Sequence, residues 1–85
     1  MEVISELHGL ILSSRGHLSE NELKEIQEFV EGRDFTLAIE TLCGFLLDRN
    51  HKVSPDLFVR IHSLCERLDV DPYLVQSVKA IVVTD

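Results

Sequence analysis

Cysteine is scarce in this sequence, and long hydrophobic runs are missing from it. The 2 cysteines, Cys43 and Cys65, are too far apart in the chain to form a Cys-x-x-Cys motif. No basic and apolar leader stands at the N-terminus, and no apolar run approaches the ~18 residues that a membrane-spanning helix requires. We therefore expect a cytoplasmic protein that makes no membrane contact and keeps both thiols reduced and buried rather than joined in a disulfide.

Basic residues are rare in one third of the chain. Residues 19–48 contain eight Asp and Glu residues but only Lys24 and Arg33 as bases, which gives this stretch a net charge of −6. The whole chain carries −7, so almost all of the excess negative charge falls there. Such a field repels nucleic acid and anionic lipid and attracts basic proteins. The negative charge therefore excludes nucleic acid as a direct ligand. An alternative to a binding role for the acids is that they only keep the protein soluble. A high net charge also favours a monomer.

Regular alternation of apolar and polar residues, the pattern of a β-strand, does not appear before Ile81, and the sequence has no internal repeat or linker. Apolar residues instead recur at helical spacing in five segments, at 2–13, at 20–31, at 35–49, and in two stretches that begin near Pro55 and Pro72. A chain of 85 residues forms one domain. The sequence therefore predicts a single all-α domain over residues 1–85, a small bundle of four to five helices.

Local signals mark where these helices begin. Ser19 and Glu22 have the spacing of a capping box, and Gly32 is a natural stop for the helix that follows. The two later helices open with a capping residue and a first-turn proline: Ser54-Pro55 and Asp71-Pro72. Asp34 is expected to cap the helix at 35–49, and Asn50, His51 and Lys52 form a polar connection after it.

The segment at 35–49 is apolar around most of its circumference, which predicts the central helix of the bundle. Its narrow non-apolar stripe consists of Thr36, Glu40, Gly44 and Asp48. Glu40 is either a solvated member of this stripe or an acid set apart by its apolar neighbours. In the last helix Tyr73, Leu74, Val78, Ile81 and Val82 are expected to contribute to the core, although the β-branched residues near its end weaken the helix prediction.

Chemistry-bearing residues are few. His62 and Cys65 share a helical face that is within reach of Cys43 on the central helix, but a structural zinc site needs four ligands, and the spacing supplies no fourth. Cys43 lies mid-stripe on the most apolar helix, where burial raises a thiol's pKa and lowers its reactivity. No glycine-rich loop precedes a helix with a lysine. We expect no enzyme activity, no metal and no cofactor; metal binding by His62, Cys65 and Cys43 stays the weaker alternative.

Residues 35–43, Phe-Thr-Leu-Ala-Ile-Glu-Thr-Leu-Cys, resemble a helix of the MafI-type immunity proteins, a family linked to contact-dependent growth inhibition. In that family an aromatic residue precedes a Leu-Ala-Ile/Leu-Glu-x-Leu-Cys run, followed by a leucine and an acid, matched here by Leu46 or Leu47 and by Asp48. Ser54 and Phe58 match the next Ser/Thr and aromatic positions, before a leucine-rich helix. The resemblance covers residues 26–73. Gly44 departs from it, since the family often has an acid there.

The resemblance implies a bacterial immunity protein that binds a cognate toxin domain in the cytosol and neutralises it. Such toxins are often nucleases, whose active sites are basic, so the charge distribution fits this partner independently. The acidic residues expected to contact the toxin in a 1:1 complex are Glu25, Glu28, Glu31, Asp34, Glu40 and Asp48. The alternative is a small acidic helical adaptor or regulatory module that binds another protein.

Overall fold

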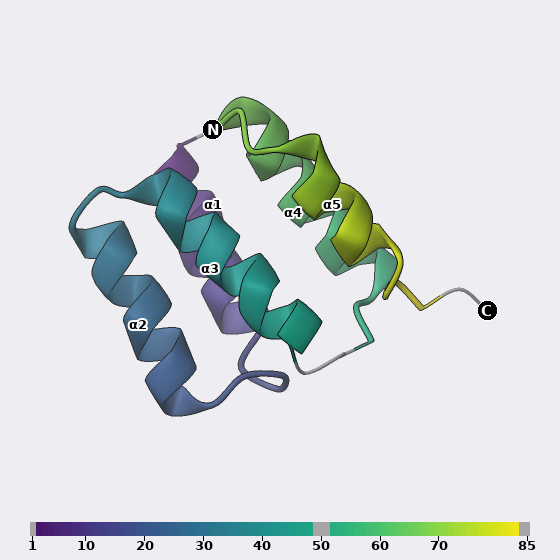
Figure 1. Ribbon diagram of the computed structural model, residues 1–85. Coiled ribbons are helices and arrows are strands. Elements are labelled where there is room, and N and C mark those ends of the chain that lie inside the picture. The colour runs from purple at the N-terminus through teal and green to yellow at the C-terminus, as the bar shows by residue number, and fades with distance from the viewer. Residues whose placement is uncertain (1, 49–51, 84–85) are drawn as a thin grey trace.

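The computed structural model describes residues 2–48 and 52–83, which form five helices: α1 (Val3–Ser13), α2 (Glu20–Glu31), α3 (Phe35–Asp48), α4 (Pro55–Arg67) and α5 (Pro72–Lys79). In Figure 1, α3 lies in front of α1, with α2 on one side of it and α4 and α5 on the other. The predicted all-α bundle is therefore confirmed, with five helices. The expected third helix extended to Arg49, which lies outside the described residues, as do Asn50 and His51.

Three of the start signals, those at Ser19, Ser54 and Asp71, act as predicted. The Ser19 hydroxyl accepts a hydrogen bond from the Glu22 backbone N–H at 3.2 Å, and the Ser19 N–H donates to Glu22 Oε1 at 2.9 Å, which completes the capping box. Ser54 Oγ accepts from the Leu57 N–H at 3.1 Å at the start of α4. Asp71 Oδ1 accepts from the Tyr73 N–H at 3.0 Å at the start of α5. These bonds satisfy N–H groups that have no partner within the helix.

Two helices end in the same backbone motif, in which a residue other than glycine takes the left-handed conformation. After α2, Arg33 has φ 62° and the Asp34 N–H donates to the Phe29 carbonyl at 2.9 Å. After α4, Asp69 has φ 59° and the Val70 N–H donates to the Cys65 carbonyl at 2.9 Å. Gly32 does end α2, but with φ −79°, so the turn uses Arg33 rather than the glycine. Both turns are Schellman motifs.

The core is centred on α3, which contacts each of the other four helices. Its buried residues are Ala38, Ile39, Leu42, Cys43 and Leu46. The central position predicted for this helix is confirmed. The polar side of α3 is wider than the predicted stripe, however, because Leu37 lies on it and is 43% exposed.

The C-terminal segment leaves the helical pattern after Lys79 and pairs with the loop before α4. The Val53 N–H donates to the Ile81 carbonyl at 2.9 Å, and the Val83 N–H donates to the Val53 carbonyl at 2.8 Å. Val53 is fully buried, and Ile81 and Val82 are half-buried against the core. The expected contribution of Tyr73 to the core is wrong, since this side chain is 77% exposed. Within 2–48 and 52–83, no helix is long and apolar enough to cross a bilayer.

Candidate protein-binding surface

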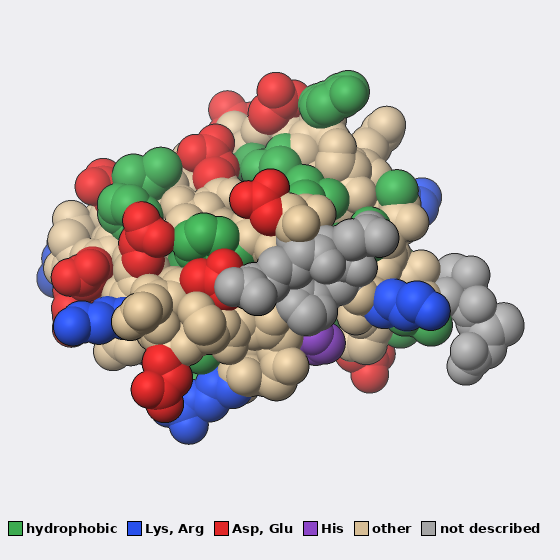
Figure 2. Space-filling model, turned by 60° about the horizontal axis from the view of Figure 1, so that its bottom comes forward, with side chains coloured by type: hydrophobic (Ala, Val, Ile, Leu, Met, Phe, Trp, Pro, Cys, Tyr) green, Lys and Arg blue, Asp and Glu red, His purple; other side chains and the backbone are tan. Residues whose placement is uncertain are grey.

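The predicted acidic contact residues lie on α2, on α3 and in the turn between them. Glu25, Glu28 and Glu31 are exposed on α2, and Asp34 is exposed in the turn. On α3, Asp48 is exposed and Glu40 is half-buried. Figure 2 shows Asp and Glu side chains, with hydrophobic side chains between them, over the part of the surface that these two helices form.

The acids of α2 divide between two sides of the helix. Successive residues are about 100° apart around an α-helix, so Glu25 and Glu31 lie about 120° from each other. Glu31 follows Gln27 by one turn, and Gln27 lines a cavity with Ile11 of α1 and with Arg15, which lies just after α1. Glu31 is therefore turned toward the α1 side of α2. We call Glu25, Glu28, Glu40 and Asp48 the acidic surface, with Asp34 and Glu31 at its edge.

Glu40 is the member of this surface with the least solvent around it. It is half-buried at the edge of the polar side of α3, and its negative charge is one of the causes that raise the pKa of the nearby Cys43 thiol. Glu40 therefore lies between the core and the polar stripe of α3, the stripe on which it was predicted to lie with Asp48. A carboxylate in this position is less screened by solvent than the exposed acids around it, so a partner's cation would gain more there.

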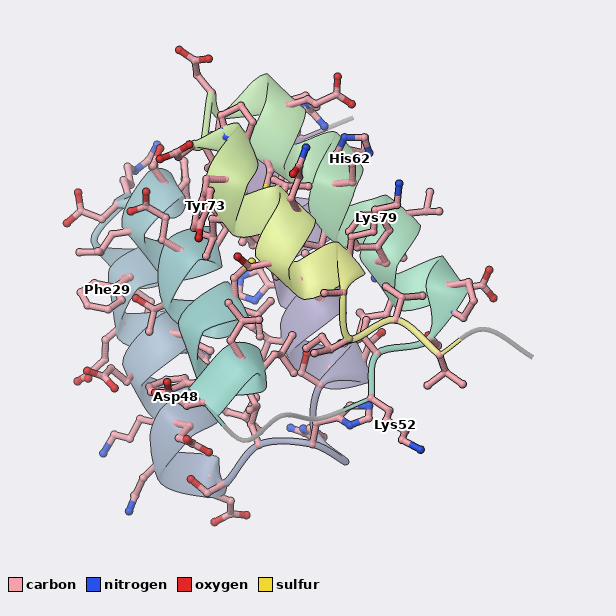
Figure 3. All side chains as sticks on the ribbon, turned by 45° about the vertical axis from the view of Figure 1, so that its right-hand side comes forward. Phe29, Asp48, Lys52, His62, Tyr73 and Lys79 are labelled. Atoms are coloured by element: carbon pink, nitrogen blue, oxygen red, sulfur yellow. The ribbon has the colours of Figure 1, made fainter. Side chains whose placement is uncertain are left out.

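Exposed and half-buried apolar side chains, which the charge pattern of the sequence did not reveal, accompany the acids. Leu37 is 43% exposed and stands three positions before Glu40 on the polar side of α3. Phe29 is half-buried on α2 and extends outward from it in Figure 3, while Tyr73 extends from α5 on the side of α3. The signal available in the sequence was the spacing of Leu37, which places it beside Thr36 and Glu40 rather than with the core residues. Apolar groups next to charges are typical of protein-binding surfaces.

The residues of the metal alternative do not assemble into a ligand set. Cys43 and Cys65 are free and buried, and their side chains share a hydrogen bond. His62 is on the outside of α4, where its ring stacks on Phe58 with centroids 5.7 Å apart and its Nε2 lies 3.5 Å from Glu66 Oε1. Across the described part of the chain, no three His, Cys, Asp or Glu side chains form a metal-binding group.

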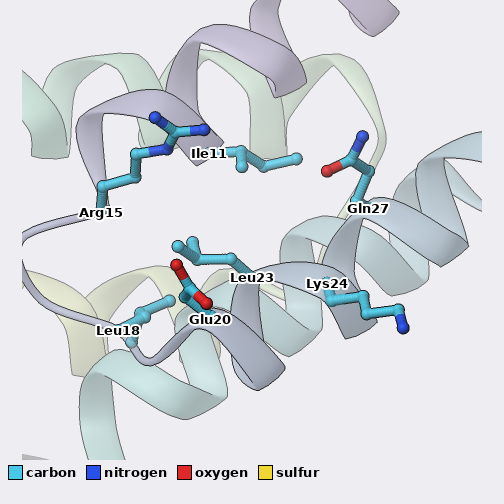
Figure 4. Close-up of a pocket in the computed structure, with 7 residues that line it drawn as sticks. All are labelled: Ile11, Arg15, Leu18, Glu20, Leu23, Lys24 and Gln27. Atoms are coloured by element: carbon cyan, nitrogen blue, oxygen red, sulfur yellow. The ribbon is translucent and has the colours of Figure 1, made fainter.

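An open cavity of about 390 Å³ lies between α1 and α2 (Figure 4). Ile11, Leu18 and Leu23 supply its apolar wall, and charged side chains of both signs, among them Arg15 and Glu20, stand around it. Its lining consists of Ile11, Arg15, Leu18, Glu20, Leu23, Lys24 and Gln27, and so contains no histidine, the side chain that most often acts as a general base. The cavity can hold a small polar group. None of the residues of the acidic surface lines it, so the two sites are separate.

Comparison of the chain with protein-family models, with curated proteins and with solved structures found no match. A functional proposal therefore rests on the residues and on their placement. The placement brings concentrated negative charge and exposed apolar groups together on α2, α3 and the adjoining edge of α5.

Proposed function

We propose that this chain is an immunity protein, which binds a toxin domain in the cytoplasm of a bacterium and neutralises it through the acidic surface. The observation that carries the proposal is the exposure of Glu25, Glu28 and Asp48 on two helices that lie side by side. The resemblance of residues 35–43 to immunity proteins supports it, because the same helix supplies Glu40 and Asp48.

The partner that fits this surface is a basic protein domain, such as a nuclease. A nuclease active site carries cations that bind phosphodiester groups, and carboxylates on a rigid helical surface occupy those cations in place of nucleic acid. Complementary fields also accelerate encounter, to rate constants of about 10⁸–10⁹ M⁻¹s⁻¹ at low salt. Leu37 and Phe29 would supply apolar contact next to the ion pairs.

The two parts of the surface are expected to act differently. Glu25, Glu28 and Asp48 are exposed, so removing one of them should mainly slow association. Glu40 is half-buried, so an ion pair made there becomes largely shielded from water when the partner docks. Cutting such a pair at one end costs about 2–5 kcal/mol of binding free energy and accelerates dissociation.

The experiment that tests this function is co-expression with a toxin domain encoded immediately upstream of this chain. The intact chain should permit growth, and Glu28→Lys should weaken protection. Glu66→Lys is the matched control, since it makes the same charge change at another exposed helical position, on α4. Equal protection by both variants would remove the acidic surface from the mechanism. Death of cells that express the intact chain would reject immunity and leave the adaptor or regulatory function.

A further inference from the structure

The two cysteines come from different helices and meet inside the bundle. Cys43 lies in the middle of α3 and Cys65 near the end of α4, and they are 0% and 1% exposed. Their side chains are close enough to share a hydrogen bond, and both are free thiols. Two thiols in contact across a helix interface meet one requirement for a disulfide, which is the closeness of their sulfur atoms.

A cavity leads to one of the two thiols. It has a volume of about 280 Å³ and lies where the end of α4 faces α5. Cys65 forms part of its wall, with His62 and Glu66 from the same helix and Val75 and Gln76 from α5. Cys43 is not part of this wall and lies behind Cys65 in the core. A small neutral oxidant that enters the cavity therefore meets Cys65 first.

The electrostatics of the pair distinguish the same thiol. The hydrogen bond with Cys43 lowers the pKa of Cys65, although burial and the charge of Glu40 oppose this effect. The pKa of Cys43 is raised by the hydrogen bond to Cys65, by burial and by the negative charges of Cys65 and Glu40. Both directions favour Cys65 over Cys43 as the thiolate of the pair. The thiolate is the form of cysteine that reacts with oxidants and disulfides.

We propose that Cys65 and Cys43 form a peroxide-sensitive pair, in which Cys65 is the oxidised thiol and Cys43 resolves it to an intramolecular disulfide between α4 and α3. The Cys65 thiolate attacks one oxygen of hydrogen peroxide, the O–O bond breaks, and hydroxide leaves and takes up the proton released by Cys65. This step gives a sulfenic acid on Cys65 and one water.

The second step uses the neighbouring thiol. Cys43 Sγ attacks Cys65 Sγ, the S–O bond breaks, and the departing hydroxyl takes the Cys43 proton to form a second water. Two thiols are thereby oxidised by two electrons, and one peroxide is reduced to two waters. The reaction consumes no residue of the acidic surface, so it is independent of the proposed function.

The test treats the intact chain with hydrogen peroxide and follows its mass and its free thiols. We expect the mass to fall by two hydrogen atoms and a peptide map without reductant to show residues 43 and 65 linked within one chain. With dimedone present during oxidation, the trapped sulfenic acid should be on Cys65. Dimedone on Cys43, links between chains, or thiols that stay free while the chain remains folded would each overturn the proposal.

Variants separate the two roles. Cys43→Ala should accumulate the Cys65 sulfenic acid, because the resolving thiol is missing. Cys65→Ala should lose its remaining thiol at least about tenfold more slowly than Cys43→Ala, because Cys43 is fully buried and does not line the cavity through which the oxidant arrives. Equal rates in the two variants, with far-UV circular dichroism showing both folded, would contradict the assigned order. If either variant unfolds, dimedone labelling of the unmodified chain decides between the two thiols.

Discussion

Leu42 and Leu37 offer a direct test of the central role of α3. Both are leucines in the same helix, but Leu42 is 0% exposed and Leu37 is 43% exposed. Replacing Leu42 by Ala leaves a cavity in the middle of the bundle, and such changes cost about 2–5 kcal/mol. A chain of 85 residues has a free energy of unfolding of about 4–13 kcal/mol, so the loss is a large fraction of the total.

Urea unfolding followed by circular dichroism measures this loss. With an m value of roughly 1–1.5 kcal/mol/M, a loss of about 3 kcal/mol lowers the midpoint by roughly 2–3 M. Leu37→Ala is the control, because it makes the same chemical change with the same change in helix propensity. We expect Leu37→Ala to cost less than about 1 kcal/mol. Equal losses at the two positions would refute the placement of α3 as the buried centre of the fold.

Four other substitutions have expected outcomes that thermal unfolding can measure. Gly44→Ala should raise the free energy of unfolding by about 0.5–1 kcal/mol, because a Cβ at this position meets no atom within 4 Å. Gly9→Ala should raise it less, because a Cβ there would lie 2.7 Å from Arg60 Nη2. Ser19→Ala removes one half of the capping box and should lower stability by about 1 kcal/mol; an unchanged unfolding temperature would argue against the box. The hydroxyl of Ser14 is buried and has no hydrogen-bond partner among the described residues. Ser14→Ala should therefore stabilise the chain by about 1 kcal/mol. A lower unfolding temperature in this variant would show that the hydroxyl has a partner.

Most of the fold could be predicted because its signals are local. The capping box of α2 and the cap-proline pairs of α4 and α5 act within three residues of the helix start, so a short stretch of sequence contains the whole interaction. The central position of α3 followed from its composition, since only a helix surrounded by others can bury apolar residues around most of its circumference.

The features that the sequence did not reveal depend on neighbours that are distant in the chain. Val53 is buried because the backbone around Val82 pairs with it, and nothing within the loop before α4 signals that partner. Tyr73 has the spacing of a core residue, but its side chain is 77% exposed because no neighbouring helix in the described part of the chain covers it. Arg33 is a different case, because its left-handed conformation belongs to a local turn, yet arginine has no preference for this conformation and so gives no signal of it.

For the candidate surface, the sequence predicted which acidic side chains are exposed better than it predicted how they are arranged relative to one another. Glu25, Glu28 and Asp48 are exposed, as expected from their places opposite the apolar stripes. The separation of Glu31 from Glu25 and the partial burial of Glu40 required knowledge of which sides of α2 and α3 are covered. The exposed Leu37 changes the expected chemistry of the surface from charge alone to charge combined with apolar contact.

The most direct measurement is the association rate constant between this chain and its upstream toxin domain, determined by stopped flow from low to high salt. The screening length falls from about 10 Å at 0.1 M to about 3 Å at 1 M ionic strength, so steering by exposed acids should weaken steeply over this range. We predict that the rate constant of the intact chain falls by at least about tenfold, and that Glu28→Lys lowers the low-salt value far more than Glu66→Lys does. A rate constant that hardly changes with salt, or that falls equally in the two variants, would contradict docking through the acidic surface.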